Sequence, residues 1–498
     1  MDILHYMLQG FAQMVSLEQL LAIAVGVAAG ILVGAMPGLS PSMGVALLVP
    51  FTYRMNPLTA LVLLLAVYQA ANYGGSITAV TINTPGTPSA VATAWDGFPL
   101  TRQGKCGWAL GISLVGSSLG GLIGILILIA FAQPLAAIAV KLHPAEYFCL
   151  AVLGLTTVAS LGGKNWAKAF IAALFGLLLA TIGIDPISGT KRYTFGAIRL
   201  FDGFDLIPAM IGLFALSEIF MRFEEEGIPR NVAKGEISKK DLWPSIRDYW
   251  KLKRVMLQSS IIGTFIGIFP GAGSTIASFL AYDAAKRTSK HPETFGQGNP
   301  EGVMASEAAN NASVGGAMVP LLTLGIPGSS STAVLIGALM IHDLVPGPML
   351  FQTNPALVYG MFASMFIAIV VLFAMGTLGA RLWIKVTRIP PGILLPMILA
   401  VAVMGSFAVN NSMFDVAVCI GFGVLGWVMR RYGFPVAPVV LGLVLGKLAE
   451  ANFRRAVIMG GYGVFFTRPA SLVLLIVSVA LFAYPLVQGY LEGRKKAA

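Results

Sequence analysis

The sequence predicts an all-α polytopic membrane protein, and three observations lead to this fold class. Hydrophobic residues make up 56% of the 498 residues, charged residues make up 11%, and the mean hydropathy is +0.81. A soluble chain carries about 25% charged residues. Apolar runs long enough to cross a hydrocarbon core of about 30 Å recur along the whole chain. Glycine and proline interrupt two of these runs at matching positions, which predicts broken helices inside the membrane.

Hydropathy predicts about a dozen membrane elements. Longer apolar runs lie at 58–80, 107–131, 168–184, 303–324, 356–380, 413–429 and 470–490, and shorter or interrupted runs at 18–50, 146–160, 203–221, 255–282, 391–407 and 435–446. The most polar connection between two of these runs divides the chain into two membrane-like halves. We therefore expect a first membrane repeat over 1–221, a cytoplasmic connection over 222–254, a second repeat over 255–469, and a C-terminal membrane helix with a basic tail over 470–498.

The two halves carry the same broken-helix motif. Residues 30–38 (GILVGAMPG) recur 233 positions later as residues 263–271 (GTFIGIFPG). A second Pro-Gly break at residues 84–87 (TPGT) is echoed 242 positions later at 326–329 (IPGS). Proline removes a backbone donor and clashes with a continuing helix, so each break is expected to split a helix within the bilayer. Broken backbone at that depth is typical of a transport site.

The charges that flank the two motifs predict that the repeats are inverted. Arg54 is the only Lys or Arg that borders the first unit, whereas twelve border the second. Because cytoplasmic loops are rich in Lys and Arg, the second unit is expected to enter and leave the membrane from the cytoplasm as a re-entrant hairpin. The first unit is expected to open to the outside, which gives two inverted repeats.

The four Pro-Gly loops are the predicted site. A hydroxyl residue followed by proline, at 40–41 (SP) and 87–88 (TP), is typical of a helix N-terminus. Serine-rich segments at 271–275 and 328–332 follow the breaks of the second half. Four helix N-termini would present unpaired N–H groups and positive dipole ends, which bind anions. Hydroxyl, amide and carbonyl oxygens at the same loops suit a hard monovalent cation.

These arguments give one set of predicted substrate- and ion-binding residues: Pro37, Gly38, Ser40, Ser42, Asn83, Thr84, Pro85, Gly86, Thr87, Pro270, Gly271, Gly273, Ser274, Thr275, Asn310, Asn311, Pro327, Gly328, Ser329 and Ser330. We expect Ser40, Thr87, Ser274 and Ser329 to act as hydroxyl caps. No Arg or Lys lies in the core of the loops, so a carboxylate is expected to be held by dipoles, hydroxyls and a co-bound cation. Asn310 and Asn311 could equally make helix–helix hydrogen bonds.

No cofactor is expected beyond a coupling cation, either sodium or a proton. The three cysteines, Cys106, Cys149 and Cys419, lack the spacing of a disulfide framework or a zinc site, so sodium at the loops is the one metal ion that we consider. The net charge of +11 is scattered over short loops. It indicates topology in a lipid membrane and not a nucleic-acid partner.

Four segments carry a resemblance to a known family: residues 34–50, residues 73–97 with the run INTPGTPSAVATAWDG, residues 267–287 (GIFPGAGSTIASFLAYDAAKR) and residues 324–348 (LGIPGSSSTAVLIGALMIHDLVPGP). They resemble the large membrane subunit of the bacterial tripartite tricarboxylate transporters, and the similarity covers nearly the whole chain. The resemblance implies a secondary transporter of the inner membrane that imports di- or tricarboxylates. It also implies a periplasmic substrate-binding protein, a small four-helix membrane subunit and an ion gradient. It does not fix which carboxylate is carried.

Two other functions compete with this interpretation. The first is a passive anion channel, although inverted broken helices fit alternating access better. The second is an intramembrane hydrolase, because residues 38–41 (GLSP) resemble a serine nucleophile loop and Tyr282-Asp283 resembles half of an aspartyl protease pair. Proline directly follows that serine, and no Gly-x-Gly-Asp supplies a second aspartate. We therefore expect a transporter and not an enzyme.

Overall fold

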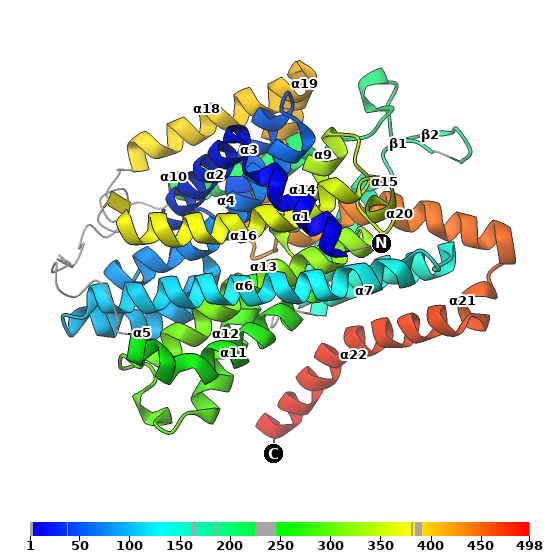
Figure 1. The fold of residues 1–498 in the computed structure, drawn as a ribbon. Coiled ribbons are helices and arrows are strands. Elements are labelled where there is room, and N and C mark those ends of the chain that lie inside the picture. The colour runs from blue at the N-terminus through cyan, green and yellow to red at the C-terminus, as the bar shows by residue number, and fades with distance from the viewer. Residues whose placement is uncertain are drawn as a thin grey trace.

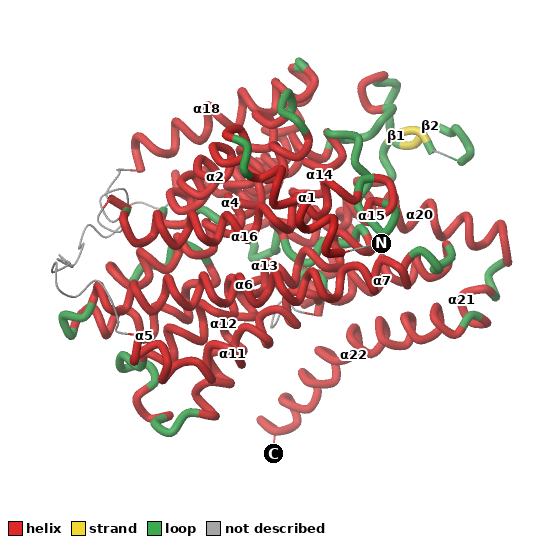
Figure 2. Tube along the Cα trace, viewed as in Figure 1, coloured by secondary structure: helices red, strands yellow, loops and turns green. Residues whose placement is uncertain are grey.

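The computed structural model is a helical bundle (Figures 1 and 2). It describes residues 3–36, 38–160, 166–185, 187–224, 246–379, 382–383 and 391–497. Within these residues the one sheet is a pair of two-residue strands, β1 (Gly183–Ile184) and β2 (Lys191–Arg192), which pair antiparallel with Gly183 opposite Arg192. The predicted all-α fold class is confirmed at this level.

The first half of the chain contains ten of the labelled α-helices. They are α1 (Ile3–Met14), α2 (Leu17–Ala35), α3 (Pro41–Leu48), α4 (Pro57–Ile82), α5 (Val91–Arg102), α6 (Cys106–Ala139), α7 (Pro144–Ser160), α8 (Trp166–Ala180), α9 (Leu206–Ile211) and α10 (Ser217–Glu224). Turns of 3-10 helix cover Val49–Thr52, Pro88–Ala90 and Ile198–Leu200, and a π-helical turn over Gly212–Leu216 joins α9 to α10.

The second half begins with a polar, basic stretch of helix. Its helices are α11 (Ile246–Ile268), α12 (Gly273–Thr288), α13 (Pro300–Leu324), α14 (Ser330–Ile341), α15 (Leu350–Thr353), α16 (Pro355–Leu378), α18 (Pro391–Asn410), α19 (Met413–Arg431), α20 (Ala437–Gly460), α21 (Val464–Thr467) and α22 (Pro469–Ala497), with a 3-10 turn over Pro292–Thr294. Figure 1 shows α22 leaving the bundle toward the C-terminus. Most of the predicted connection over 222–254 lies outside the described residues.

Six helices in the described part of the chain are long and apolar enough to cross a membrane. They are Leu17–Ala35, Pro57–Ile82, Cys106–Ala139, Leu206–Glu224, Pro355–Leu378 and Met413–Arg431. Five shorter apolar helices accompany them, at Pro41–Thr52, Trp166–Ala180, Ser330–Ile341, Leu395–Asn410 and Pro469–Ala483. The apolar window of α4 is completely buried, so α4 lies at the centre of the bundle. A multi-pass membrane protein follows, and the predicted number of about a dozen membrane elements stays a prediction.

In the first half, α2 packs closely on α4 through its glycines. A Cβ atom on Gly30 would collide with the carbonyl oxygen of Val67, and one on Gly34 with that of Ala71. Since the contacts advance in the same direction along both helices, α2 and α4 run parallel. Glycines four residues apart allow this backbone contact, as is common in membrane helix pairs.

The second half repeats this contact. A Cβ atom on Gly263 of α11 would collide with the carbonyl oxygen of Ala309 in α13, and one on Gly267 with that of Ser313. The two glycines lie 233 positions after those of α2, and their partners lie 242 positions after those of α4. Helices α11 and α13 are therefore parallel to each other, like α2 and α4.

The two central helices α4 and α13 cross in opposite directions. Tyr68 of α4 forms a hydrogen bond with Ser329. The residue before Ser329, Gly328, packs against Ala317 of α13, so Tyr68 lies near Ala317. Further along α4, the carbonyl oxygen of Asn72 accepts from Nδ2 of Asn310 at 3.0 Å. As the residue number rises along α4, its partner in α13 falls. The α2–α4 pair is therefore oriented opposite to the α11–α13 pair.

We predict that Gly34→Leu and Gly267→Leu each destabilise the protein, because a leucine at either position has no room beside the facing backbone. Overpacking of this kind costs about 1–3 kcal/mol. The matched control is Gly421→Leu in α19, where a Cβ atom would meet open space. Thermal unfolding of the detergent-purified protein, followed by size-exclusion chromatography, measures the effect. Equal melting temperatures for the three variants would contradict the packing described here.

Candidate functional site

The first loop joins α2 to α3 and ends in a helix cap, as the sequence predicts. Ser40 Oγ accepts a hydrogen bond from the Met43 backbone N–H at 3.2 Å, with Pro41 as the first helical residue. Ser42 Oγ lies 2.9 Å from Ser40 Oγ. Gly38 has φ +87°, a conformation that glycine adopts without strain. Pro37 lies outside the described residues.

A positive side chain lies beside this loop, which the sequence analysis missed. The Arg222 guanidinium occupies the space where a Gly38 side chain would stand. Its Nε lies 3.4 Å from Glu218 Oε1, and the other oxygen of that carboxylate lies 2.9 Å from Nη1 of Arg430. Two guanidinium charges therefore share one carboxylate, which leaves positive charge at the Gly38 loop. The sequence analysis expected dipoles, hydroxyls and a co-bound cation to face an anion here, and the structure adds a fixed guanidinium beside the loop.

The second loop, between α4 and α5, returns to the α2–α4 contact. The Gly86 backbone N–H donates to the Gly75 carbonyl at 3.1 Å. Thr87 precedes a short 3-10 turn, and its hydroxyl lies 3.1 Å from Ser89 Oγ without capping a backbone N–H. The predicted cap at Thr87 is therefore wrong, because no α-helix starts there. Pro85 is half-buried, and Asn83 and Thr84 are exposed.

The third loop joins α11 to α12. The Gly271 backbone N–H donates to the Gly328 carbonyl at 3.0 Å, which joins this loop to the fourth one. Helix α12 begins at Gly273, and Ala272 is its N-cap residue, so Ser274 already lies in the first turn. The predicted cap at Ser274 is therefore wrong. Its hydroxyl instead donates to Asn72 Oδ1 at 3.3 Å.

The residues of the third loop and of the first turn after it are half-buried, namely Pro270, Gly271, Gly273, Ser274 and Thr275. The fourth loop is more deeply buried, at Pro327, Gly328 and Ser329, whereas Ser330 is half-buried. Its cap is the one that the sequence predicts. Ser329 Oγ accepts from the Thr332 N–H at 3.2 Å, and Thr332 Oγ1 accepts from the Ser329 N–H at 2.8 Å, which completes a capping box.

The third and fourth loops meet in a buried polar centre between α4 and α13. Tyr68 Oη lies 2.8 Å from Ser329 Oγ, and Asn72 bonds to both Ser274 and Asn310. Oδ1 of Asn310 and Nδ2 of Asn311 are buried and have no hydrogen-bond partner among the described residues. Buried polar atoms are nearly always paired, so two unpaired ones in one turn of helix indicate a place for a ligand.

Glu307 lies one turn before these asparagines and is fully buried, and it was not among the residues predicted from the sequence. Its Oε1 accepts from Thr93 Oγ1 at 2.6 Å, and its Oε2 accepts from Ser117 Oγ at 2.7 Å. The available signal was the single carboxylate in the long uncharged run of α13. An ionisable residue inside a membrane segment is a functional candidate by default.

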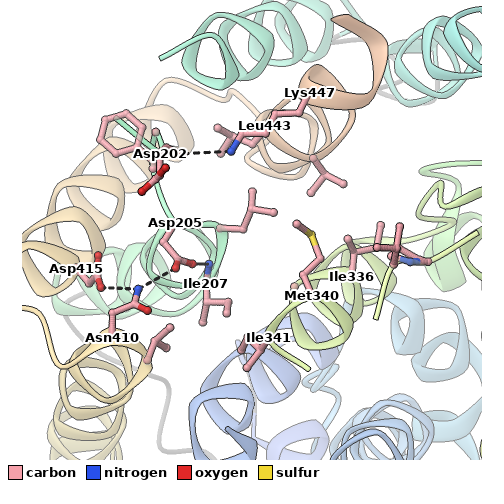
Figure 3. Close-up of a pocket in the computed structure, with 18 of the residues that line it drawn as sticks. Asp202, Asp205, Ile207, Ile336, Met340, Ile341, Asn410, Asp415, Leu443 and Lys447 are labelled. Carbon is pink, nitrogen blue, oxygen red and sulfur yellow. Dashed lines mark hydrogen bonds between the residues drawn. The ribbon is translucent and has the colours of Figure 1, made fainter. Parts of the chain in front are cut away.

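A separate cavity of about 730 Å³ opens at the far end of α14 (Figure 3). Asn410 Nδ2 donates to Asp205 and to Asp415, each at 3.0 Å, and Lys447 donates to the Asp202 carbonyl at 3.2 Å. None of the predicted site residues that the structure describes lines this cavity. The polar centre and the cavity are therefore distinct features of the fold.

Comparison with known proteins identifies the family. The model of the tripartite tricarboxylate transporter TctA family matches residues 20–441. The chain belongs to this family. The TctA-family chain is also 38% identical over 498 residues to an uncharacterized 52.8 kDa protein in the TAR-I ttuC' 3' region of Agrobacterium vitis, covering 100% of this chain and 99% of that protein.

A second relative from Agrobacterium vitis is an uncharacterized protein in the TAR-II ttuC' 3' region. It is 40% identical over 231 residues, which cover 45% of this chain and 96% of that protein. No solved structure matches the chain. Membership of the TctA family makes the protein the large component of a tripartite transport system, and this agrees with its membrane-spanning helices.

We predict an energetic coupling between Tyr68 and Ser329 of about 1 kcal/mol, since a buried hydrogen bond joins them. Tyr68→Phe, Ser329→Ala and the double variant form the cycle, with thermal unfolding as the readout. Ser412→Ala is the matched control, because Ser412 caps α19 through Phe414. It should cost about 1 kcal/mol, the usual value for a cap alone. Strictly additive effects of Tyr68→Phe and Ser329→Ala would contradict the bond.

Proposed function

We propose that this TctA-family protein is the membrane-spanning large subunit of an ion-gradient-driven importer of organic di- or tricarboxylates. The observation that carries the proposal is the meeting of broken-helix loops at the buried centre of the bundle. The third and fourth loops join through Gly271 and Gly328, and both bond to α4. Loops of this kind bind substrates and ions in secondary transporters.

The opposite orientation of the two glycine-packed helix pairs supports inverted repeats. In the proposed arrangement, the α2–α3 hairpin opens to the outside and the α11–α12 hairpin opens to the cytoplasm. The tip of one hairpin can then move away from the centre of the bundle while the other hairpin stays packed against it. Alternating access of this kind moves the substrate past a fixed centre.

The carboxylate site of this proposal combines helix N-termini with a fixed cation. Ser40 and Ser329 cap α3 and α14, so both helices direct their N-terminal N–H groups toward the loops. Arg222 adds a guanidinium next to Gly38. Because arginine pairs with carboxylates through two parallel hydrogen bonds, it is suited to hold one arm of a di- or tricarboxylate. The twenty residues predicted from the sequence supply the remaining contacts.

Two partners belong to the proposal. A periplasmic binding protein delivers the carboxylate, and a small four-helix membrane subunit completes the transporter in the bacterial inner membrane. The tripartite name of the family supports both, and the resemblance described above supports the inner membrane. Sodium or protons supply the driving gradient.

Uptake into proteoliposomes tests this function. With both membrane subunits in the vesicles and the binding protein outside, citrate and smaller dicarboxylates should accumulate against their gradient when sodium or proton gradients are imposed separately. An ionophore should abolish the accumulation. Downhill flux without accumulation would indicate a passive anion channel and would contradict the proposal.

We predict that Arg222→Gln raises the KM for the carboxylate about tenfold or more, because hydrogen bonds to charged groups are worth about 1.5–3 kcal/mol. The matched control is Arg431→Gln, which removes a guanidinium that pairs with Glu224 at 2.9 Å and is more exposed than Arg222. Initial rates of uptake over a range of substrate concentrations separate KM from the maximal rate. An unchanged KM in Arg222→Gln would remove Arg222 from the site.

We also predict that Phe195 and Lys290 face opposite sides of the membrane. Both are exposed, and they lie near opposite ends of α13, since the Phe195 loop leads to Asp205 beside Gly325. In a variant without the native cysteines, an impermeant thiol reagent should label Phe195→Cys from outside intact cells. It should label Lys290→Cys only in inverted vesicles. Labelling of both from the same side would contradict the proposed topology.

A further inference from the structure

Glu307 is a carboxylate enclosed by neutral groups at the centre of the bundle. Its side chain is fully buried, and hydroxyls from α5 and α6 donate to its two oxygens. Ser306 Oγ lies 2.9 Å from the same Thr93 hydroxyl. Each contact is made by an oxygen that can donate to the carboxylate or turn to face a cation.

Glu307 has no salt-bridge partner among the described residues. Among the titratable groups on the helices around it, Tyr73 of α4 is close enough to interact with its charge, and Asp96 of α5 and Tyr282 of α12 are buried polar groups on the neighbouring helices. Those two bond to each other at 2.7 Å, and Asp96 also accepts three backbone N–H groups of residues 296–299. None of the three brings a positive charge, and the basic residues of α5 and α12, namely Arg102, Lys286 and Arg287, form no salt bridge with Glu307. An ionised carboxylate buried without a partner is strongly unfavourable, so a single cation or a proton must accompany it.

A second observation points to a ligand at the same place. The amide of Asn310, one turn along α13, lies beside the Glu307 carboxylate. Oδ1 of Asn310 is buried without a hydrogen-bond partner in the described part of the chain. The carboxylate and the two hydroxyls are oxygen ligands that suit a hard cation, and rotation of the Asn310 side chain would bring its unpaired amide oxygen to the same place.

This cluster is joined to the loops of both halves. Asn310 donates to the Asn72 carbonyl, and Asn72 accepts from Ser274 in the first turn of α12. On the other side, Thr93 lies on α5, the arm that follows the second loop. A change of charge at Glu307 therefore affects one segment that follows a break in each half, namely α5 and α12.

We infer that Glu307, with Thr93, Ser117 and Asn310, forms the site of the coupling cation, which is a proton or a sodium ion. Binding removes the net charge of the carboxylate and lets α5, α6 and α13 pack around it. Loss of the cation leaves a charge that only water can stabilise. The cation therefore binds more tightly when α5, α6 and α13 are packed around the carboxylate than when water reaches it. This difference in affinity couples the cation gradient to the motion of the loops. Its role in coupling rests on the proposed transport function, whereas binding itself does not.

Binding is tested first, on the full chain in detergent without any transport. Thermal stability of the wild type is measured against sodium concentration at fixed pH, and against pH without sodium. A sodium site predicts that stability rises with sodium concentration. A proton site predicts that stability falls as pH rises, because the protonated side chain is the one that fits the apolar surroundings.

Glu307→Gln keeps the shape of a protonated glutamate and should lose whichever response the wild type shows. Glu301→Gln, in the first turn of the same helix, is the matched control and should keep it. Where Glu307→Gln does not fold, Ser117→Ala decides, since it retains the carboxylate. It should shift the midpoint of the response by about tenfold or more, the value of a hydrogen bond to a charged group. A wild type without either response, or a response unchanged in these variants, would overturn the inference.

Transport is tested second, in proteoliposomes. Glu307→Gln should lose gradient-driven accumulation of the carboxylate but keep exchange of internal for external carboxylate, which needs no net movement of the cation. If the wild type does not accumulate a carboxylate, the proposed function fails while the stability assay still decides the cation site. If Glu307→Gln accumulates the carboxylate as the wild type does, the assignment of Glu307 is wrong.

Discussion

The backbone groups freed at the helix breaks must find partners inside the protein, and the rest of the structure depends on how they do so. Lipid offers no hydrogen bonds, so a break in a membrane helix is stable only where other protein groups supply them. The Gly271 N–H donates a hydrogen bond to the Gly328 carbonyl, and the Gly86 N–H donates one to the Gly75 carbonyl. Each bond fixes a loop against a neighbouring helix or loop. The breaks are therefore points where separate segments of the chain are held together.

Small residues make these bonds possible. A Cβ atom on Gly86 would meet the Gly34 carbonyl, and one on Gly328 would lie 2.8 Å from the Gly267 carbonyl. The same glycines that let α2 approach α4 and α11 approach α13 thus also admit the loops. Dispersion contacts, which need close approach, hold such helices together in lipid. The short repeated motif in the sequence therefore serves both the packing of the helices and the placement of the breaks.

The sequence predicted features that depend on local chemistry. Composition gave the membrane class, and the hydroxyl caps at Ser40 and Ser329 followed from residues next to the breaks. Ser274 shows the limit of this reasoning, since the N-cap of α12 is Ala272, two residues before the predicted cap. That small shift moves the hydroxyl from the cap into the first turn, where it faces Asn72. No local signal sets the helix start, because the Gly271–Gly328 bond between loops helps to fix it.

The two charged residues at the centre were missed for another reason. Arg222 reaches Gly38 from a helix distant in the sequence, and Glu307 gains its partners from α5 and α6. Such meetings depend on the packing of the whole bundle. Glu307 is nevertheless visible in the sequence as the one charged residue between positions 302 and 324, and its burial was predictable.

The short arms of the hairpins have an electrical consequence. Helix α3 has 8 residues and α14 has 12, so they are about 12 and 18 Å long at 1.5 Å per residue, well short of the 30 Å core. When such an arm moves aside, water from that face reaches the centre of the bilayer. The membrane voltage then falls across a layer about half as thick, and the local field is correspondingly stronger. A charge that moves a few ångströms through this layer does the electrical work of a much longer passage, at about 2.3 kcal/mol per charge for a full drop of 100 mV.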